Sequence, residues 1–182
     1  MHEEIVKALE VLKNGGVILY PTDTIWGIGC DATNPAAVKK VYEIKKRDDS
    51  KALVILINEI GKLRTYVNEV PEIAWDLVDF SEDPLTVVYP EGKNLANNLL
   101  ANDGSVAIRL CKDEFCSKLM ERFKRPLVST SANLSGELSP KNFTEISETV
   151  LNEVDYVVNW HQNEIQNPKP SRIVSLGVNG EF

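Results

Sequence analysis

A short apolar run that ends in a polar turn decides how this chain folds: residues 17–29 read VILYPTDTIWGIG. The run VILY stops at Pro21, which lacks a backbone N–H, so the pattern predicts a strand that ends in a polar segment. Two more polar segments follow apolar runs, KKR at 45–47 and STSANLSG at 129–136. Hydroxyls, glycines and fixed cations at such ends can donate to a ligand rich in anionic oxygen, such as a nucleotide phosphate.

Helices and short strands alternate on either side of this stretch. Apolar residues at helical spacing predict a helix over 3–13, ended by NGG, and Asn34-Pro35 predicts the start of a second helix that ends near Lys45. Further strands are predicted at 52–57, 85–89, 106–110, 127–129, 156–158 and 172–176, and further helices at 60–66, 72–78, 113–123 and 140–153. The alternation predicts one α/β domain over 1–182, with a twisted mixed parallel and antiparallel sheet and helices on both faces.

Length and composition fit a folded domain. The chain has 182 residues, of which 43% are hydrophobic, and this is enough to bury a continuous core. No apolar run approaches the roughly 20 residues needed to cross a bilayer, and the first residues do not resemble a secretory signal. We therefore expect a cytoplasmic protein with no membrane partner.

The cysteine, histidine and charge content argues against several kinds of site. Three cysteines without a Cys-x-x-Cys spacing predict buried free thiols rather than disulfides or structural zinc. His2 and His161 are the only histidines, which disfavours a His-centred triad or metal site. The net charge of −7 opposes tight, sequence-independent nucleic-acid binding, although the cations clustered from Lys39 to Arg47 suit one polyphosphate.

The first two polar segments also have purely structural interpretations. The side chains at 22–24 can cap a turn, while Gly27 and Gly29 would let a ligand approach the backbone closely. The cations at 45–47 can stabilise the negative end of a helix dipole. Alternatively, Lys45 and Arg47 leave the helix together and bind phosphate oxygens, while the lysine between them points elsewhere.

The third segment has the same two interpretations. Ser131 and Asn133 can belong to a polar turn that caps a helix starting at Ser139-Pro140, or they can face a ligand. If no ligand binds, all three polar segments must have purely structural roles, in this order and within one small domain.

The three segments together resemble the signature of the YrdC/TsaC-type threonylcarbamoyl-AMP synthases. The resemblance rests on Thr-Asp-Thr at 22–24, on the Lys-x-Arg of Lys45 and Arg47, and on the Ser-x-Asn of Ser131 and Asn133. It covers nearly the whole chain, including the apolar run after Lys51 and the Ser-Val-Ala-Ile-Arg stretch at 105–109. It implies a fold of the YrdC/RibB-like type.

The resemblance also implies an activity. Such an enzyme combines L-threonine, bicarbonate or carbon dioxide, and ATP into threonylcarbamoyl-AMP and releases pyrophosphate, with Mg²⁺ bound to ATP. Partner proteins use the product to modify tRNA, and direct contact with tRNA is expected to be weak. Two cations would neutralise the repulsion between a carbamate and the α-phosphate and hold the reactants in line, so that no side-chain nucleophile is needed.

The family's site residues carry over to matching positions. The resemblance implies a catalytic tetrad of Lys45, Arg47, Ser131 and Asn133 around the phosphates and threonyl group, with Lys45, Arg47 and Asn133 at the nucleotide. Further positions match threonine or ATP contacts: Thr22, Thr24, Ser105, Arg109 and Ser171. Because helix-end charges contribute little to stability, we expect Lys45→Ala and Arg47→Ala to abolish turnover with the Tm almost unchanged.

The sequence departs from the family pattern at four places. Trp26 stands where tyrosine is usual, which leaves a stacking wall without the hydroxyl. Asp48 replaces a proline after Lys-x-Arg, and Lys141 stands where a hydroxyl residue is common. The sequence ends at Phe182, before a strand whose arginine often meets ATP in relatives.

Two other functions are compatible with the same fold. One is a binding module for double-stranded RNA or tRNA, which would need a concave basic surface. The other is a nucleotide-binding paralogue that acts on a different acceptor, as in carbamoyl-transferring hydrogenase-maturation proteins.

Overall fold

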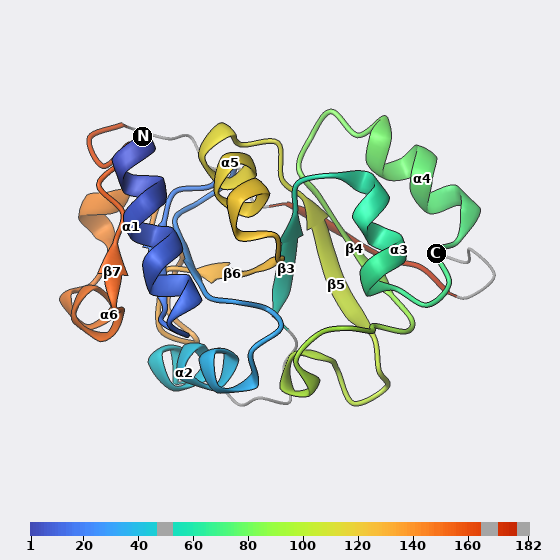
Figure 1. Ribbon diagram of the computed structural model, residues 1–182, viewed down its shortest axis with the longest axis horizontal. Helices are drawn as coiled ribbons and strands as arrows, with labels where there is room; N and C mark the ends of the chain where they lie inside the picture. Colours follow the sequence, from blue (N-terminus) through green and yellow to red (C-terminus); the bar gives the residue numbers. More distant parts are fainter. Residues whose placement is uncertain (47–52, 165–170, 178–182) are drawn as a thin grey trace.

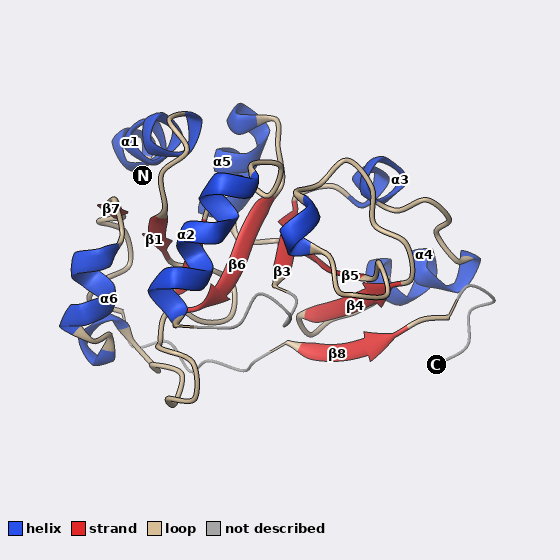
Figure 2. Ribbon diagram, turned by 90° about the horizontal axis from the view of Figure 1, so that it is seen from below, coloured by secondary structure: helices blue, strands red, loops and turns tan. Residues whose placement is uncertain are grey.

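The sheet organises the whole chain. The computed structural model describes residues 1–46, 53–164 and 171–177. Within these ranges, eight strands form one sheet in the order β7 (Tyr156–Val157), β1 (Ile18–Tyr20), β2 (Gly27–Gly29), β6 (Leu127–Ser131), β3 (Val54–Ile57), β5 (Val106–Leu110), β4 (Leu85–Tyr89) and β8 (Arg172–Ser175). The pairs β1–β7, β3–β5 and β4–β8 are parallel and the others are antiparallel, which confirms the predicted mixed sheet. Figure 2 shows β4 and β8 side by side at one edge.

Helices pack on both faces of this sheet, as predicted. The α-helices are α1 (His2–Lys13), α2 (Pro35–Lys45), α3 (Leu63–Tyr66), α4 (Glu72–Asp79), α5 (Glu114–Phe123) and α6 (Glu148–Glu153), and 3₁₀ turns lie at Ile60–Lys62, Asn97–Leu99 and Phe143–Glu145. Successive residues of β1 point to opposite faces, so Ile18 packs in the core under α1 and α5, while Leu19 packs with α2. Figure 1 shows α1 and α5 together over one half of the sheet.

Local capping sets the bounds of α2. The side chain of Asn34 accepts hydrogen bonds from the backbone N–H groups of Ala36 and Ala37, and Pro35 occupies the first turn. The helix ends because Lys46 adopts a left-handed conformation with φ of 49°. Lys45 and Lys46 therefore leave the helix in different directions, and Lys45 is buried while Lys46 is exposed.

The predicted helix over 140–153 is wrong in its first half. Only Glu148–Glu153 is α-helical, and it is capped by Ser147 rather than started at Ser139-Pro140. Polar side chains before it bond locally instead: Glu145 accepts from the backbone N–H of Lys141, and Asn142 accepts from the Thr144 hydroxyl. Such local bonds compete with helical ones, which explains the irregular segment.

The segment Gly27–Gly29 is a strand that the sequence pattern did not predict. It pairs with β1 and β6, and the pairing of Gly27 with Ser131 extends β6 beyond the predicted 127–129. A Cβ on Gly29 would lie 2.3 Å from the Val128 carbonyl oxygen and 2.6 Å from the Tyr20 ring. Glycine at 29 thus serves the close packing of strands rather than the approach of a ligand.

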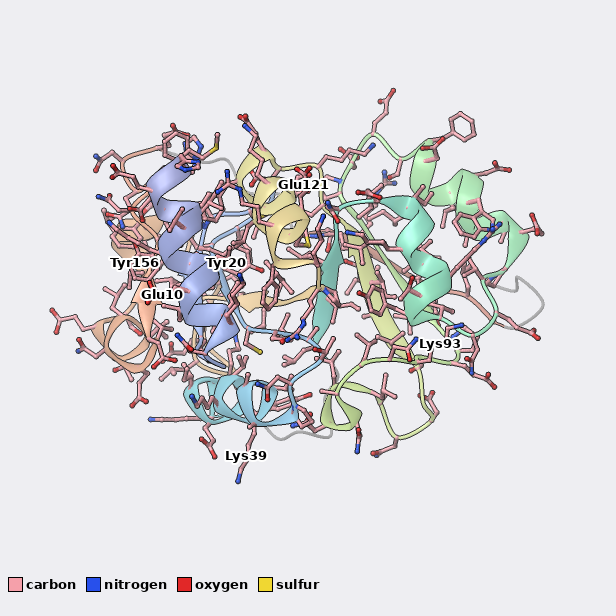
Figure 3. All side chains as sticks on the ribbon, viewed as in Figure 1. Glu10, Tyr20, Lys39, Lys93, Glu121 and Tyr156 are labelled. Atoms are coloured by element: carbon pink, nitrogen blue, oxygen red, sulfur yellow. The ribbon has the colours of Figure 1, made fainter. Side chains whose placement is uncertain are left out.

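The N-terminal helix α1 is joined to β7 at one edge of the sheet. The Tyr156 hydroxyl donates to the Glu4 carboxylate at 2.5 Å, and the backbone N–H of Asn159 donates to the same oxygen at 2.7 Å. Figure 3 labels Tyr156 beside α1. Burial opposes ionisation of Glu4, but the bonds from Tyr156, Asn159 and Lys7 outweigh it and lower the pKa of Glu4.

Candidate functional site

The polar turn between β1 and β2 lies against Arg109 of β5. Arg109 is only 5% exposed, and one of its terminal nitrogens donates to the Thr24 hydroxyl at 2.7 Å. The other terminal nitrogen lies 3.1 Å from a carboxylate oxygen of Asp23. Segments 85 residues apart in the sequence are thereby joined in one polar cluster.

The hydroxyl groups of this turn form a chain with one direction. The Thr22 hydroxyl donates to the Ile25 carbonyl at 2.7 Å and accepts from the backbone N–H of Thr24 at 3.1 Å. Because a hydroxyl has one proton, the 3.0 Å contact between the two threonine hydroxyls must be donated by Thr24. Thr22 is therefore saturated within the turn, which bears out the turn-capping interpretation for this residue, and Thr24 keeps one lone pair for a ligand.

Lys45 meets Ser131 and Asn133, as the family resemblance implies. Its ammonium donates to the Ser131 carbonyl at 2.6 Å, to the Ser131 hydroxyl at 3.3 Å and to the Asn133 amide oxygen at 3.2 Å. The Lys45 carbonyl in turn accepts from the backbone N–H of Ser135 at 2.8 Å. The end of α2 is thus fixed to the loop after β6, while Arg47 and Asp48 lie outside the described residues.

Both amide N–H groups of Asn133 and its amide oxygen have partners inside the protein. Its oxygen accepts from Lys45, and its nitrogen donates to the carbonyls of Leu134 at 3.1 Å and Glu137 at 2.8 Å. Asn133 is 8% exposed. In this arrangement it orients Lys45 and closes the loop at 134–137.

A cavity of about 290 Å³ joins the two clusters. It is lined by Thr24, Ile25, Gly27, Leu53, Val54, Arg109, Ser129, Thr130, Ser131, Ser171 and Ile173. Four predicted site residues are therefore in its wall, and Thr22, Lys45 and Asn133 each hydrogen-bond a residue of that wall. Ser105 lies elsewhere, at the opposite end of β5 from Arg109, where its backbone N–H donates to Asp103. The roles of all these residues stay predictions.

Several lining residues were not singled out from the sequence. Ser129 and Thr130 belong to the quoted polar segment but lie within β6, and Val54 and Ile173 are ordinary strand residues by pattern. Ser171 is fixed by a 2.8 Å hydrogen bond to the buried Thr86 of β4. The sequence holds one clue to this contact: Thr86 is a polar residue within a buried strand, and such a residue requires a polar partner.

Trp26 does not form a wall of this cavity. It is 1% exposed, and its ring lies 4.9 Å from the ring of Phe143, centroid to centroid, in a tilted arrangement. The expected stacking surface is therefore part of the core. Lys141 is exposed, and its backbone rather than its side chain makes the contact with Glu145.

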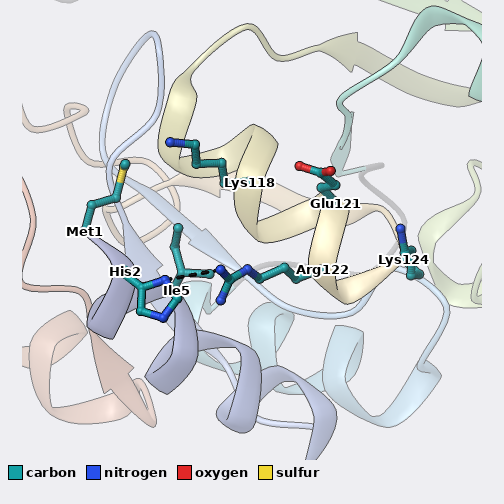
Figure 4. A pocket seen from close by; sticks show the side chains of 7 residues that line it. All are labelled: Met1, His2, Ile5, Lys118, Glu121, Arg122 and Lys124. Atoms are coloured by element: carbon teal, nitrogen blue, oxygen red, sulfur yellow. Dashed lines mark hydrogen bonds between the residues drawn. The ribbon is translucent and has the colours of Figure 1, made fainter.

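A larger hollow of about 490 Å³ lies apart from the predicted site, between α1 and α5. Figure 4 shows its lining: Met1, His2, Ile5, Lys118, Glu121, Arg122 and Lys124. Arg122 contacts the His2 ring at 3.2 Å and Lys118 pairs with Glu114 at 2.6 Å, so two of its cations have partners in the protein. It contains none of the residues that the sequence singled out for binding or catalysis.

Within the described ranges, the cysteines are not arranged for catalysis or metal binding. Cys30, Cys111 and Cys116 are buried free thiols, as predicted. Burial raises the pKa of the Cys116 thiol well above its usual range, which makes it a poor nucleophile. In the same part of the chain, no three His, Cys, Asp or Glu side chains gather as a metal site, and no helix is long and apolar enough to span a membrane.

Known proteins resemble the chain over nearly its full length. A threonylcarbamoyl-AMP synthase of Pseudoalteromonas translucida is 33% identical over 157 residues, which cover 85% of this chain and 84% of that protein. A putative threonylcarbamoyl-AMP synthase of Methanocaldococcus jannaschii is 35% identical over 179 residues, which cover 96% of this chain and 83% of that protein. The crystal structure of P. abyssi Sua5 complexed with L-threonine has a TM-score of 0.85 and 28% identity over 94% of this chain, which spans 50% of that longer chain.

The family assignment follows from the same coverage. Residues 10–181 match the Sua5/YciO/YrdC family, which carries the description telomere recombination. The matched range contains every residue of the polar turn, the α2 terminus and the β6 loop described above. On this match, and with relatives above 30% identity along most of its length, the chain belongs to the Sua5/YciO/YrdC family.

Proposed function

We propose that this chain is a threonylcarbamoyl-AMP synthase, which joins L-threonine, carbon dioxide or bicarbonate, and ATP with release of pyrophosphate. The observation that carries the proposal is the cavity between Arg109 and the Lys45–Ser131–Asn133 cluster. Arg109 in its wall would bind a carboxylate, and Lys45, which donates to Ser131 of that wall, would supply positive charge for the phosphates. The names of relatives at 33% and 35% identity support the same reaction.

The residues divide the reaction between two ends of the cavity. Arg109 would bind the carboxylate of threonine, and the free lone pair of Thr24 would accept from its amino group. The neutral amine attacks carbon dioxide, a C–N bond forms as one C=O π bond opens onto its oxygen, and the nitrogen releases a proton to water to give a carbamate. A carbamate oxygen then attacks the α-phosphorus as the bond to the β-phosphate oxygen breaks. Lys45, and Arg47 by the resemblance, would neutralise the charge that builds up there.

Mg²⁺ would enter with ATP rather than reside in the protein. Asp23 is paired with Arg109, and Ser129, Thr130 and Ser131 are among the residues that line the cavity. Neutral oxygens and water suit a Mg²⁺ whose charged ligands are the substrate phosphates. When bound, the ion would lower the negative charge on the phosphate oxygens.

The product implies downstream partners. Threonylcarbamoyl-AMP is a reactive mixed anhydride, so we propose that tRNA-modifying proteins consume it in the cytoplasm. The acidic net charge of −7 argues that tRNA itself binds weakly.

The test is pyrophosphate release with each substrate omitted in turn. Purified protein with ATP, Mg²⁺, bicarbonate and labelled threonine should release pyrophosphate and form a labelled adenylate only when threonine is present. Release that ignores threonine would overturn the proposal. Salt-sensitive RNA binding without ATP turnover would favour the RNA-binding module, and turnover with another carbamoyl acceptor would favour the paralogue.

A further inference from the structure

We propose that Asp23 is a positioning residue, which orients Arg109 so that the guanidinium receives the carboxylate of the amino-acid substrate. This inference rests on the proposed function and adds a residue to it. By sequence Asp23 belongs to a polar turn, and its place beside Arg109 gives it a second role.

Arg109 depends on Asp23 for its orientation. The guanidinium is held by two groups, the neutral hydroxyl of Thr24 at 2.7 Å and the carboxylate of Asp23 at 3.1 Å. Its Nε is buried without a hydrogen-bond partner among the described residues. Asp23 is therefore the charged partner that fixes the plane of the guanidinium.

Asp23 acts from behind Arg109 rather than from within the reaction cavity. Arg109 lines the 290 Å³ cavity, whereas Asp23 lines a separate hollow of about 170 Å³ with Ser81, Asp83 and Lys112. The Asp23 side chain is 19% exposed, and the Cys111 thiol donates to it at 3.6 Å. A substrate in the reaction cavity would meet the guanidinium, so any effect of Asp23 on threonine passes through Arg109.

Asp23→Asn keeps the shape of the side chain and removes its charge. We expect the KM for threonine to rise about tenfold or more, a loss of about 1.4 kcal/mol in apparent binding, with the KM for ATP unchanged. The phosphate end of the cavity is held by Lys45, Ser131 and Asn133, which do not touch Asp23 in the described structure. A merely structural role would raise both KM values together or lower kcat alone.

Asp83→Asn is a matched control. Asp83 lines the same small hollow and pairs with Arg172 at the same 3.1 Å, but it has no contact with Arg109. Both KM values should be unchanged in this variant. In an Arg109→Ala background, Asp23→Asn should add nothing to the KM for threonine, because a positioning residue has no effect without the group it positions.

The outcomes separate this inference from the proposed function. If the wild-type protein shows no threonine-dependent pyrophosphate release, the proposed function and the role of Asp23 are both overturned. Active wild type with an unchanged or lower KM for threonine in Asp23→Asn overturns only the role of Asp23, and so does an additive effect in the Arg109→Ala background. If Asp23→Asn unfolds at the assay temperature, Asp23→Glu, which keeps the charge on a longer stem, must raise the KM for threonine alone.

Discussion

Among single residues, Lys45 has an environment that differs from what its sequence pattern suggests. A lysine in the last turn of a helix suggests an exposed charge near the macrodipole, yet Lys45 is 2% exposed and donates to three oxygens of the β6 segment. The expectation that Lys45→Ala leaves the Tm almost unchanged is therefore no longer tenable. Arg47, to which the same expectation applied, lies outside the described residues.

Lys45→Met should lower both stability and turnover. The variant keeps the aliphatic stem but leaves the Asn133 amide oxygen without its Lys45 donor and the Ser131 carbonyl with only the backbone N–H of Asn133, which costs about 1–3 kcal/mol. Calorimetry should show a Tm lower by several degrees, since each kcal/mol shifts a domain of this size by about 2–4 °C. Lys39→Met, on the exposed side of the same helix, should leave the Tm and the turnover unchanged. Equal Tm values for the two variants would refute the structural role of Lys45.

Ser131→Ala and Asn133→Ala should differ in stability while both reduce activity. Ser131→Ala removes only the 3.3 Å contact and keeps the 2.6 Å bond from Lys45 to the backbone carbonyl, so the free energy of unfolding should change by less than about 1 kcal/mol. Asn133→Ala removes three hydrogen bonds of a nearly buried amide and should cost about 1–3 kcal/mol. Urea unfolding and the KM for ATP measure the two effects, and a reversed order of stability would contradict the contacts.

Among the elements, β2 depends on a strand position that only glycine fits. Gly29 lies where the Val128 carbonyl and the Tyr20 ring approach its Cα, and the Tyr20 hydroxyl donates to that carbonyl at 3.0 Å. The strand therefore owes its existence to its neighbours, because glycine-rich segments have a low intrinsic strand propensity.

Gly29→Ala should destabilise the protein by about 1–3 kcal/mol or more, because both close neighbours would have to move. Gly61→Ala is the control, since a Cβ there would meet nothing within 4 Å, and we expect a change of less than about 1 kcal/mol in either direction. The urea midpoint of each variant measures the difference. A Gly29→Ala midpoint equal to that of Gly61→Ala would show that β2 tolerates a side chain.

Elements with their own local signals could be predicted from the sequence. Asn34 and Pro35 define the start of α2, and Asp113 caps α5 by accepting from the backbone N–H of Cys116. The helix prediction was wrong over 140–147, because polar side chains there bond the local backbone and each other instead of leaving the backbone to form helical hydrogen bonds.

In the whole molecule, the candidate site joins parts of the chain that no local rule brings together. Lys45 and Asn133 are 88 residues apart, and their meeting depends on β6 lying between β2 and β3. The residue types suggested phosphate binding, but only the resemblance to a family put them in one cavity. Asp23 was missed as a partner of Arg109 because an aspartate in a turn is sufficiently explained by capping.

The link between α1 and β7 predicts how stability depends on pH. The pKa of Glu4 is lowered in the folded protein, so its ionised form stabilises the fold above the unfolded value of about 4.3, and this contribution is lost as the pH falls through the folded value. Glu4→Gln should flatten the acid side of a plot of unfolding free energy against pH. Glu3→Gln, in the same turn but exposed, should not, and identical profiles for the two variants would refute the link.

The position of β6 in the sheet also determines when the protein can acquire its shape during synthesis. This strand is encoded late, at Leu127–Ser131, but it is inserted between two strands that leave the ribosome much earlier. Until it emerges, β2 and β3 lack their common neighbour and Lys45 lacks its oxygen partners. A nascent chain that stalls before residue 127 would therefore expose two unpaired strand edges, the kind of surface that chaperones recognise.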